Sequence, residues 1–263
     1  MIRKILHITL IALAPILVVV LLGFAATTNK KLPCIELSVS VNGNGNSHFV
    51  DAENLRQEII SRFTAVEGHP IRGSMLREIK EMVNNNPHVK SSRVFRSING
   101  NVTVEVTQRE PLVRVFTAHN KGYYIDVDGK LMPLSNNYTA RVMVAGGHIF
   151  AGYSNEIDLK EVINSNEAST NEKILTDIFK LASFINENPF WRAFIDYIHV
   201  KPYRKFELTP KNGAHIVEFG TLDEMEYKFR KLETFYLNGL TFTGWDKYRR
   251  LNVKFKNQVV CSQ

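Results

Sequence analysis

The sequence predicts an α+β protein with a single amino-terminal transmembrane helix, a small domain of order β-α-α-β-β, and a mixed β-rich domain with flanking helices. Three patterns in its 263 residues predict this arrangement. An almost unbroken apolar run covers residues 5–26. Two amphipathic segments precede a hairpin pattern at residues 87–111, and short strand-like segments dominate from residue 112 on. Two helices on one face of a small sheet form a stable layered arrangement.

The apolar run at residues 5–26 has the length of a membrane span. At about 1.5 Å per residue, such a helix reaches roughly 30 Å, the thickness of the hydrocarbon core. A cleaved signal peptide is the alternative, because Arg3 and Lys4 precede the run and residues 23–25 could be a processing site. The run exceeds the apolar core of about 7–15 residues in signal peptides, which favours an uncleaved anchor. Residues 1–4 are then a cytoplasmic tail. The rest lies in the periplasm or extracytoplasmic space, beyond the cytoplasmic (inner) membrane.

The segment after the apolar run predicts one strand and two helices. A polar linker covers residues 27–33, and alternation over residues 35–41 predicts a half-buried strand. Asp51 is placed to cap a first helix and Ser74 to cap a second, which ends before Pro87. The apolar positions expected on the inward helix faces are Leu55, Ile59, Ile60, Phe63, Met75, Leu76, Ile79, Met82 and Val83.

Residues 87–111 predict a hairpin that closes the small domain. Residues 89–98 are rich in Val, Phe and Ile, and residues 102–107 alternate between Val and polar side chains, the period of a half-buried strand. Asn99 and Gly100 between them suit a two-residue type I′ turn, because both residue types tolerate positive φ angles.

The remainder reads as short strands interrupted by two helices. Helices are expected at residues 165–188, where apolar side chains recur on one face, and at residues 222–237. Strands are expected at residues 112–116, 122–127, 130–134, 141–144, 194–200, 205–209, 214–219 and, as the last strand, 248–260.

No residue pattern signals catalysis or a cofactor. The eight histidines are scattered and form no zinc motif, and the two cysteines, Cys34 and Cys261, have no metal-ligand spacing. The sequence does not decide whether the two cysteines form a disulfide. Residues 126–129 begin like a calcium loop, but a β-turn between strands fits their spacing better. We therefore expect a protein that is no enzyme, with no cofactor and no bound metal.

The net charge of +7 does not indicate nucleic-acid binding, because the tightest basic cluster, residues 247–250, is too short for that. Basic side chains on an extracytoplasmic face could equally meet acidic partners or anionic lipid headgroups.

In combination, the motifs around the hairpin resemble those of one bacterial family. The chain is similar to the FtsQ/DivIB cell-division proteins, which have a POTRA domain followed by a β domain; here these would be residues 34–110 and 111–263. The turn at residues 97–100 departs from the Trp-Pro usual in the family. Gly100 of that turn is expected to have a structural role. The matching residues are Pro87, Val89, Val94, Arg96, Val102, Val104, Val106, Arg109, Glu110 and Pro111, with Asp126 and Gly129 in the following "ID-x-x-G" hairpin.

The resemblance implies a non-enzymatic, bitopic scaffold that links recruitment to the division site with septal peptidoglycan synthesis. Its implied partners are small bitopic coiled-coil division proteins of the FtsB/DivIC and FtsL type, other membrane proteins of the division complex, and lipid through one helix. The last strand would pair with the FtsB/DivIC-type partner, although the pattern alone also fits a solvated sheet edge. The implied partner-binding residues are Tyr248, Leu251, Val253, Lys254, Phe255, Lys256, Asn257, Gln258 and Val259.

The last strand also departs from the family. Phe255 stands where the family often has Tyr, Asn257 and Gln258 replace a small Ser/Asn-Gly pair, and the later Trp is missing. Two other functions stay open from sequence: a POTRA-containing periplasmic adaptor in protein export, and an anchored cell-wall enzyme.

Overall fold

The computed structural model describes residues 13, 15–21, 33–43, 48–63, 66–165, 167–211, 215–245 and 247–263. Leu13 and residues 15–21 are helical. The rest of the predicted transmembrane span, and all but Pro33 of the predicted linker, lie outside the described residues. Within the part of the chain that is described, no helix has both the length and the apolar character to cross a membrane. The chain divides into two compact units, Met1–Gln108 and Arg109–Gln263.

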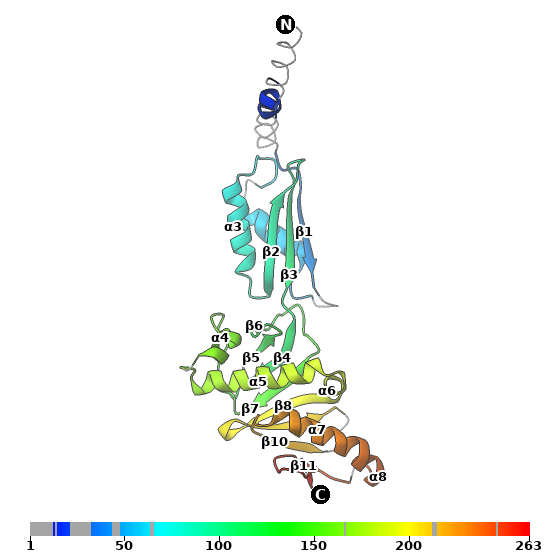
Figure 1. Ribbon diagram of the computed structural model, residues 1–263. Helices are drawn as coiled ribbons and strands as arrows, with labels where there is room; N and C mark the ends of the chain where they lie inside the picture. The colour runs from blue at the N-terminus through cyan, green and yellow to red at the C-terminus, as the bar shows by residue number, and fades with distance from the viewer. Residues whose placement is uncertain are drawn as a thin grey trace, which may run out of the picture. The chain divides into compact units, whose positions relative to one another are not determined.

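The first unit has the predicted order β-α-α-β-β (Figure 1). Its described strands form a three-stranded sheet of order β1-β3-β2, in which β1 runs parallel and β2 antiparallel to β3. The elements are β1 (Leu37–Asn42), α2 (Ala52–Arg62), α3 (Gly73–Asn84), β2 (Val89–Arg96) and β3 (Val102–Gln108). This confirms the α+β prediction for the small domain.

The core of the first unit follows from the alternation of β3. Val102, Val104 and Val106 are fully buried, together with Ile59 of α2 and Ile79 of α3. The predicted cap at α2 is confirmed, because the Asp51 carboxylate accepts a hydrogen bond of 2.8 Å from the Asn54 N–H.

The predicted cap at α3 is wrong. That helix begins at Gly73, after an extended Arg72, so Ser74 lies inside its first turn.

The β2–β3 turn also differs from the prediction. The Ser97 N–H donates to Asn101 O at 2.8 Å, and the Gly100 N–H donates to Ser97 O at 3.0 Å. Gly100 has a φ of +95°, whereas Asn99 keeps a negative φ. A type I′ turn needs two residues of positive φ, so that prediction is wrong. The loop is the three-residue kind, in which one left-handed residue follows a type I turn.

The second unit is built on a mixed sheet of nine strands among the described residues, in the order β12-β11-β10-β9-β8-β7-β4-β5-β6. The pairs β4·β7, β7·β8 and β10·β11 are parallel, and the other neighbours are antiparallel. The strands are β4 (Pro111–Phe116), β5 (Gly122–Asp126), β6 (Leu131–Pro133), β7 (Met143–Gly147), β8 (Ile195–Lys201), β9 (Lys205–Pro210), β10 (Ile216–Gly220), β11 (Arg250–Asn252) and β12 (Val260–Ser262).

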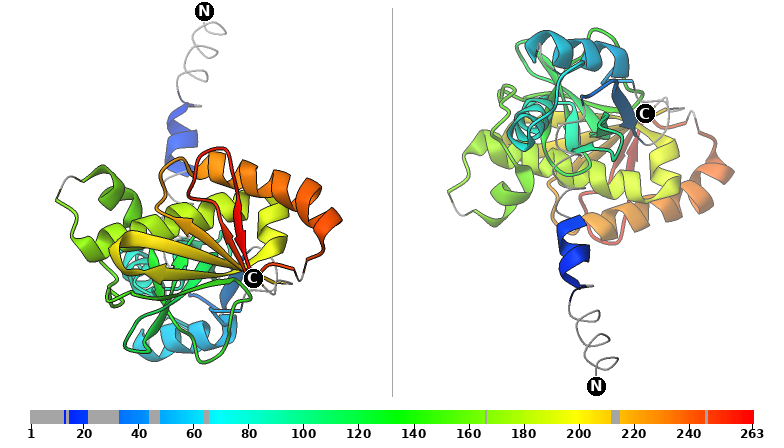
Figure 2. Two further views of the ribbon diagram at one scale, coloured as in Figure 1. Left: turned by 90° about the horizontal axis from the view of Figure 1, so that it is seen from below. Right: turned by 90° about the horizontal axis from the view of Figure 1, so that it is seen from above.

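Helices pack on this sheet around one hydrophobic core (Figure 2). The longest, α5 (Thr170–Glu187), begins at a capping box in which Ser169 and Glu172 satisfy each other's backbone N–H groups. Its buried face, together with α7 (Met225–Phe235), covers Trp191, which is 1% exposed. Two helices of six residues, α4 (Leu159–Asn164) and α6 (Pro189–Phe194), were not predicted, because so short a segment shows little periodicity. After α7 the helix continues through Tyr236–Leu240 into α8 (Thr241–Thr243).

Candidate functional site

The outermost strand at one end of the large sheet is β12. It pairs antiparallel with β11, so that Cys261 lies opposite Leu251, and β11 in turn pairs parallel with β10. No described strand pairs with the other side of β12. Val260 on this strand is 43% exposed. An edge of this kind presents backbone N–H and C=O groups to which another strand can pair.

The predicted continuous strand over residues 248–260 is wrong. Two short strands, Arg250–Asn252 and Val260–Ser262, take its place. The chain between them leaves the ladder and turns at Lys256 and Asn257, where Asn257 has a φ of +60°. The Asn252 side chain assists this departure, because its Oδ1 accepts a hydrogen bond of 3.0 Å from the Lys254 N–H.

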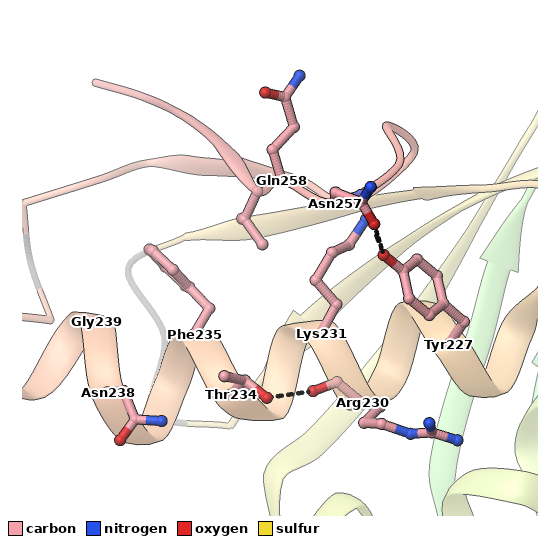
Figure 3. Close-up of a pocket in the computed structure, with 10 residues that line it drawn as sticks. Tyr227, Arg230, Lys231, Thr234, Phe235, Asn238, Gly239, Asn257 and Gln258 are labelled. Atoms are coloured by element: carbon pink, nitrogen blue, oxygen red, sulfur yellow. Dashed lines mark hydrogen bonds between the residues drawn. The ribbon is translucent and has the colours of Figure 1, made fainter.

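Two side chains of α7 hold the segment between the strands, and we call them the α7 clip (Figure 3). The Lys231 ammonium donates to Val253 O at 2.8 Å and also to Phe255 O. The Tyr227 hydroxyl donates to Asn257 Oδ1 at 2.7 Å and accepts from the Asn257 N–H at 3.1 Å. Desolvation lowers the pKa of Lys231, against a smaller opposing effect of Glu224. The clip therefore fixes the path by which the chain reaches β12.

A hollow of about 580 Å³ lies between α7 and the clipped segment. Phe235 and Gly239 line it from the helix side, and Val259 and Gln258 from the segment side. Figure 3 shows Lys231 reaching from α7 toward the segment, while Gln258 points away from the helix. A Cβ on Gly239 would lie 2.9 Å from the Phe235 ring, so a side chain at this position would push that ring aside. The hollow can accept an apolar side chain next to the open edge.

The structure separates the predicted partner-binding residues into buried, half-buried and exposed groups. Leu251 and Val253 are fully buried in the core, so their side chains cannot meet a partner. Phe255 is 49% exposed, and Val259 is half-buried against the core and lines the hollow. Tyr248 lies before β11 and is half-buried. The exposed group comprises Lys254, Phe255, Lys256, Asn257 and Gln258.

An ion-pair network crosses β9, β10 and β11. Arg250 bridges two carboxylates: its Nε lies 2.6 Å from Glu218 Oε1, and its Nη2 lies 2.7 Å from Glu207 Oε1. Lys254 Nζ lies 3.0 Å from Glu218 Oε2. The hydrogen bond from Arg250, followed by that from Lys254, lowers the pKa of Glu218. The network connects the strand that precedes the clipped segment to the interior of the sheet.

The motif residues at the start of the second unit form a second cluster, far along the sheet order from β12. Arg109 Nη1 lies 2.9 Å from Asp126 Oδ2, and the Asp126 side chain is fully buried. The other oxygen of Asp126 accepts from the N–H groups of Asp128 and Lys130, at 2.9 and 2.8 Å. The Val127 N–H donates to Glu110 O at 3.0 Å. The Arg-Glu-Pro and Asp-x-x-Gly motifs thus lock to each other.

This lock explains the remaining motif positions of the second unit. Gly129 has a φ of +85°, and a Cβ there would contact Leu159 and Phe179 at 3.4 Å. Pro111 is the first residue of β4 and lies opposite Asp126. Residues 126–129 form a turn between strands, as the sequence favoured over a calcium loop. In the described part of the chain, no cluster of His, Cys, Asp and Glu side chains is suited to a metal ion.

The motif positions of the first unit are structural as well. Pro87 follows α3, and Val89, 1% exposed, opens β2. Arg96 ends β2 opposite Val102, just before the turn that contains Gly100. Among the described residues both cysteines are free thiols, with Cys34 buried.

Sequence reasoning missed the α7 clip. The sequence predicts a helix over residues 222–237, and nothing in that segment assigns a role to Tyr227 or Lys231. Tyr227 lies 30 residues before its partner along the chain, and Lys231 lies 22 and 24 residues before its two partners. Such distant contacts leave no local pattern in the sequence.

The fold and the edge together define a class: a POTRA-like domain followed by a mixed-sheet domain whose carboxyl-terminal strand is open. Residues 32–107 match the POTRA-like domain, and residues 110–262 match the family described as FtsQ/DivIB, C-terminal related. The second match covers more than half of the chain, and the chain belongs to the FtsQ/DivIB family. No curated protein matches it. The family domains imply a scaffold role in cell division, and the family is in general non-enzymatic.

Proposed function

We propose that this protein is a single-pass membrane scaffold of the bacterial division complex that binds a partner by adding its strand to β12. The observation that carries the proposal is the open edge of β12, held in place by the α7 clip. Strand addition uses main-chain hydrogen bonds for affinity and side-chain pockets for specificity. Both elements are present, since the hollow beside Val259 can receive a side chain of the added segment.

The partner in this proposal is a small bitopic coiled-coil division protein of the FtsB/DivIC type, with an FtsL-type protein in the same assembly. An apolar side chain flanking the partner strand enters the hollow against Phe235 and Val259. Lys256, whose side chain is 79% exposed and whose ammonium lies 3.9 Å from Glu224, suits an acidic side chain on the partner. By this binding the protein connects recruitment at the division site with septal peptidoglycan synthesis.

The proposed topology places residues 1–4 in the cytoplasm, a transmembrane helix over residues 5–26 and the remainder outside the cytoplasmic membrane. The apolar length of that run supports this part of the proposal. A fluorescent fusion should then collect at midcell, and depletion should give filaments. Diffuse envelope fluorescence with normal division would count against a division role.

The binding experiment substitutes proline along the open edge, at Val260, Cys261 and Ser262 in turn. Along an edge strand, successive N–H groups point in turn to the neighbouring strand and to the open side. At least one of the three prolines therefore removes an N–H group that faces the partner and leaves the pairing with β11 intact. We expect that variant to lose binding in a pull-down with an FtsB/DivIC-type protein while the fold is retained. Val260→Thr is the matched control, because it keeps the N–H and the branched shape. Full binding by all three folded proline variants would refute strand addition at β12.

A further inference from the structure

A second hollow, of about 400 Å³, opens at one end of the large sheet and does not involve β11 or β12. The strands β4, β7 and β8 run parallel, and β9 runs antiparallel to β8. The starts of β4, β7 and β8 and the end of β9 therefore lie at the same end of the sheet. Leu112, Met143 and Ile195 supply an apolar wall there, and Lys211 follows β9.

Three exposed cationic residues from separate segments line this hollow: Arg141 from the chain before β7, Arg192 from α6, and Lys211. Within the described residues, neither guanidinium has a hydrogen-bond or ion-pair partner. Among the described residues, Lys211 Nζ donates to Arg192 O alone, at 3.2 Å, and the Lys211 N–H donates to Phe194 O at 2.8 Å, which fixes its backbone beside α6. Of the described residues that line the same space, Asp196 alone carries a carboxylate.

We propose that this hollow binds a phosphate group. Three cations and one carboxylate leave an excess of two positive charges, which matches a phosphate dianion rather than a single carboxylate. Guanidinium groups present planar forks of N–H donors that suit tetrahedral oxyanions, and a lysine adds a point charge. The apolar wall formed by Leu112, Met143 and Ile195 can contact the organic part of a phosphate ester.

The phosphate can be a free anion or the headgroup of a lipid, and two probes separate these sources. The full-length protein in a nonionic detergent is titrated with inorganic phosphate and, separately, with glycerol 3-phosphate, by calorimetry at low ionic strength and pH 7.5, where both probes are mainly dianions. Binding of inorganic phosphate identifies a free dianion site. Binding of glycerol 3-phosphate alone identifies a site for a phosphomonoester lipid headgroup, and both results support the phosphate chemistry.

The side chains are tested by Arg141→Gln, Arg192→Gln and Lys211→Gln. Each removes one charged donor, so we expect affinity for the bound probe to fall roughly tenfold or more. Asp196→Asn removes the one carboxylate and should tighten binding, a response that a merely structural role would not produce. Arg77→Gln and Lys173→Gln are matched controls, because they make the same charge change at exposed helix positions outside the hollow.

Equal losses in the control and hollow variants would show a general effect of net charge and would overturn the proposal. The absence of binding by both probes would overturn it as well. Neither result bears on strand addition at β12, because the hollow lies on other strands.

Discussion

Lys231→Met should release the segment that leads to β12. The substitution keeps most of the apolar stem of the side chain and removes both hydrogen bonds, to Val253 O and Phe255 O. Hydrogen bonds from a charged group contribute about 1.5–3 kcal/mol each to stability. The ammonium is half-buried and its desolvation opposes this gain. We therefore expect the free energy that holds the segment closed to fall by about 2 kcal/mol, which raises the open population of the segment roughly 30-fold.

Hydrogen exchange of the full-length protein measures this opening directly. Residues 253–262 should exchange roughly 30-fold faster in Lys231→Met, while the amides of β8 and β9 keep their protection. Arg230→Met is the matched control, because Arg230 is the exposed neighbour on the same helix and makes no side-chain hydrogen bond or ion pair with a described residue. Unchanged exchange of residues 253–262 in a folded Lys231→Met protein would refute the role of the clip.

Two further predictions concern stability. Arg109→Met should lower the free energy of unfolding of the second unit by about 3 kcal/mol in urea titrations, because it leaves the Asp126 carboxylate buried without its cation. The double variant Arg109→Met/Asp126→Asn should recover part of that loss. An unchanged free energy of unfolding in Arg109→Met would contradict a stabilising role for this ion pair. Burial lowers the pKa of His215 below 6.5, so the unfolded chain takes up a proton near that pH that the folded protein does not. The stability that neutral His215 provides is thus complete above pH 6.5 and falls as the pH drops below it; urea midpoints at pH 7.5 and about 5 should show this slope, and His215→Phe should remove it.

Patterns within a single element predicted most of the elements correctly. Alternation at Val102, Val104 and Val106 identified β3 and its buried face, and Asp51 marked the start of α2. Such features depend on neighbours in the chain. The error at Asn99 arose because Asn99 and Gly100 both tolerate a positive φ, and only Gly100 adopts one. The error at Ser74 arose because α3 begins after Arg72, which makes no side-chain cap hydrogen bond and so gives no capping signal in the sequence.

The carboxyl terminus shows what local patterns cannot predict. Residues 248–260 alternate as a strand should, yet β11 is held to three residues because Lys231 and Tyr227 draw the following segment onto α7. The open edge consequently lies at Val260–Ser262, later than the sequence placed it. The parallel pairing of β10 with β11 is likewise set by contacts between segments more than 30 residues apart.

The lock between Arg109 and Asp126 has a mechanical consequence. Arg109 is the first residue of the second unit, so a pull on the chain from the first unit reaches it before β4. Such tension loads the ion pair and the bond from Val127 N–H to Glu110 O before any rung of the β4·β5 ladder. The Arg109–Asp126 ion pair and the Val127–Glu110 hydrogen bond must therefore break before tension from the first unit can separate β4 from β5.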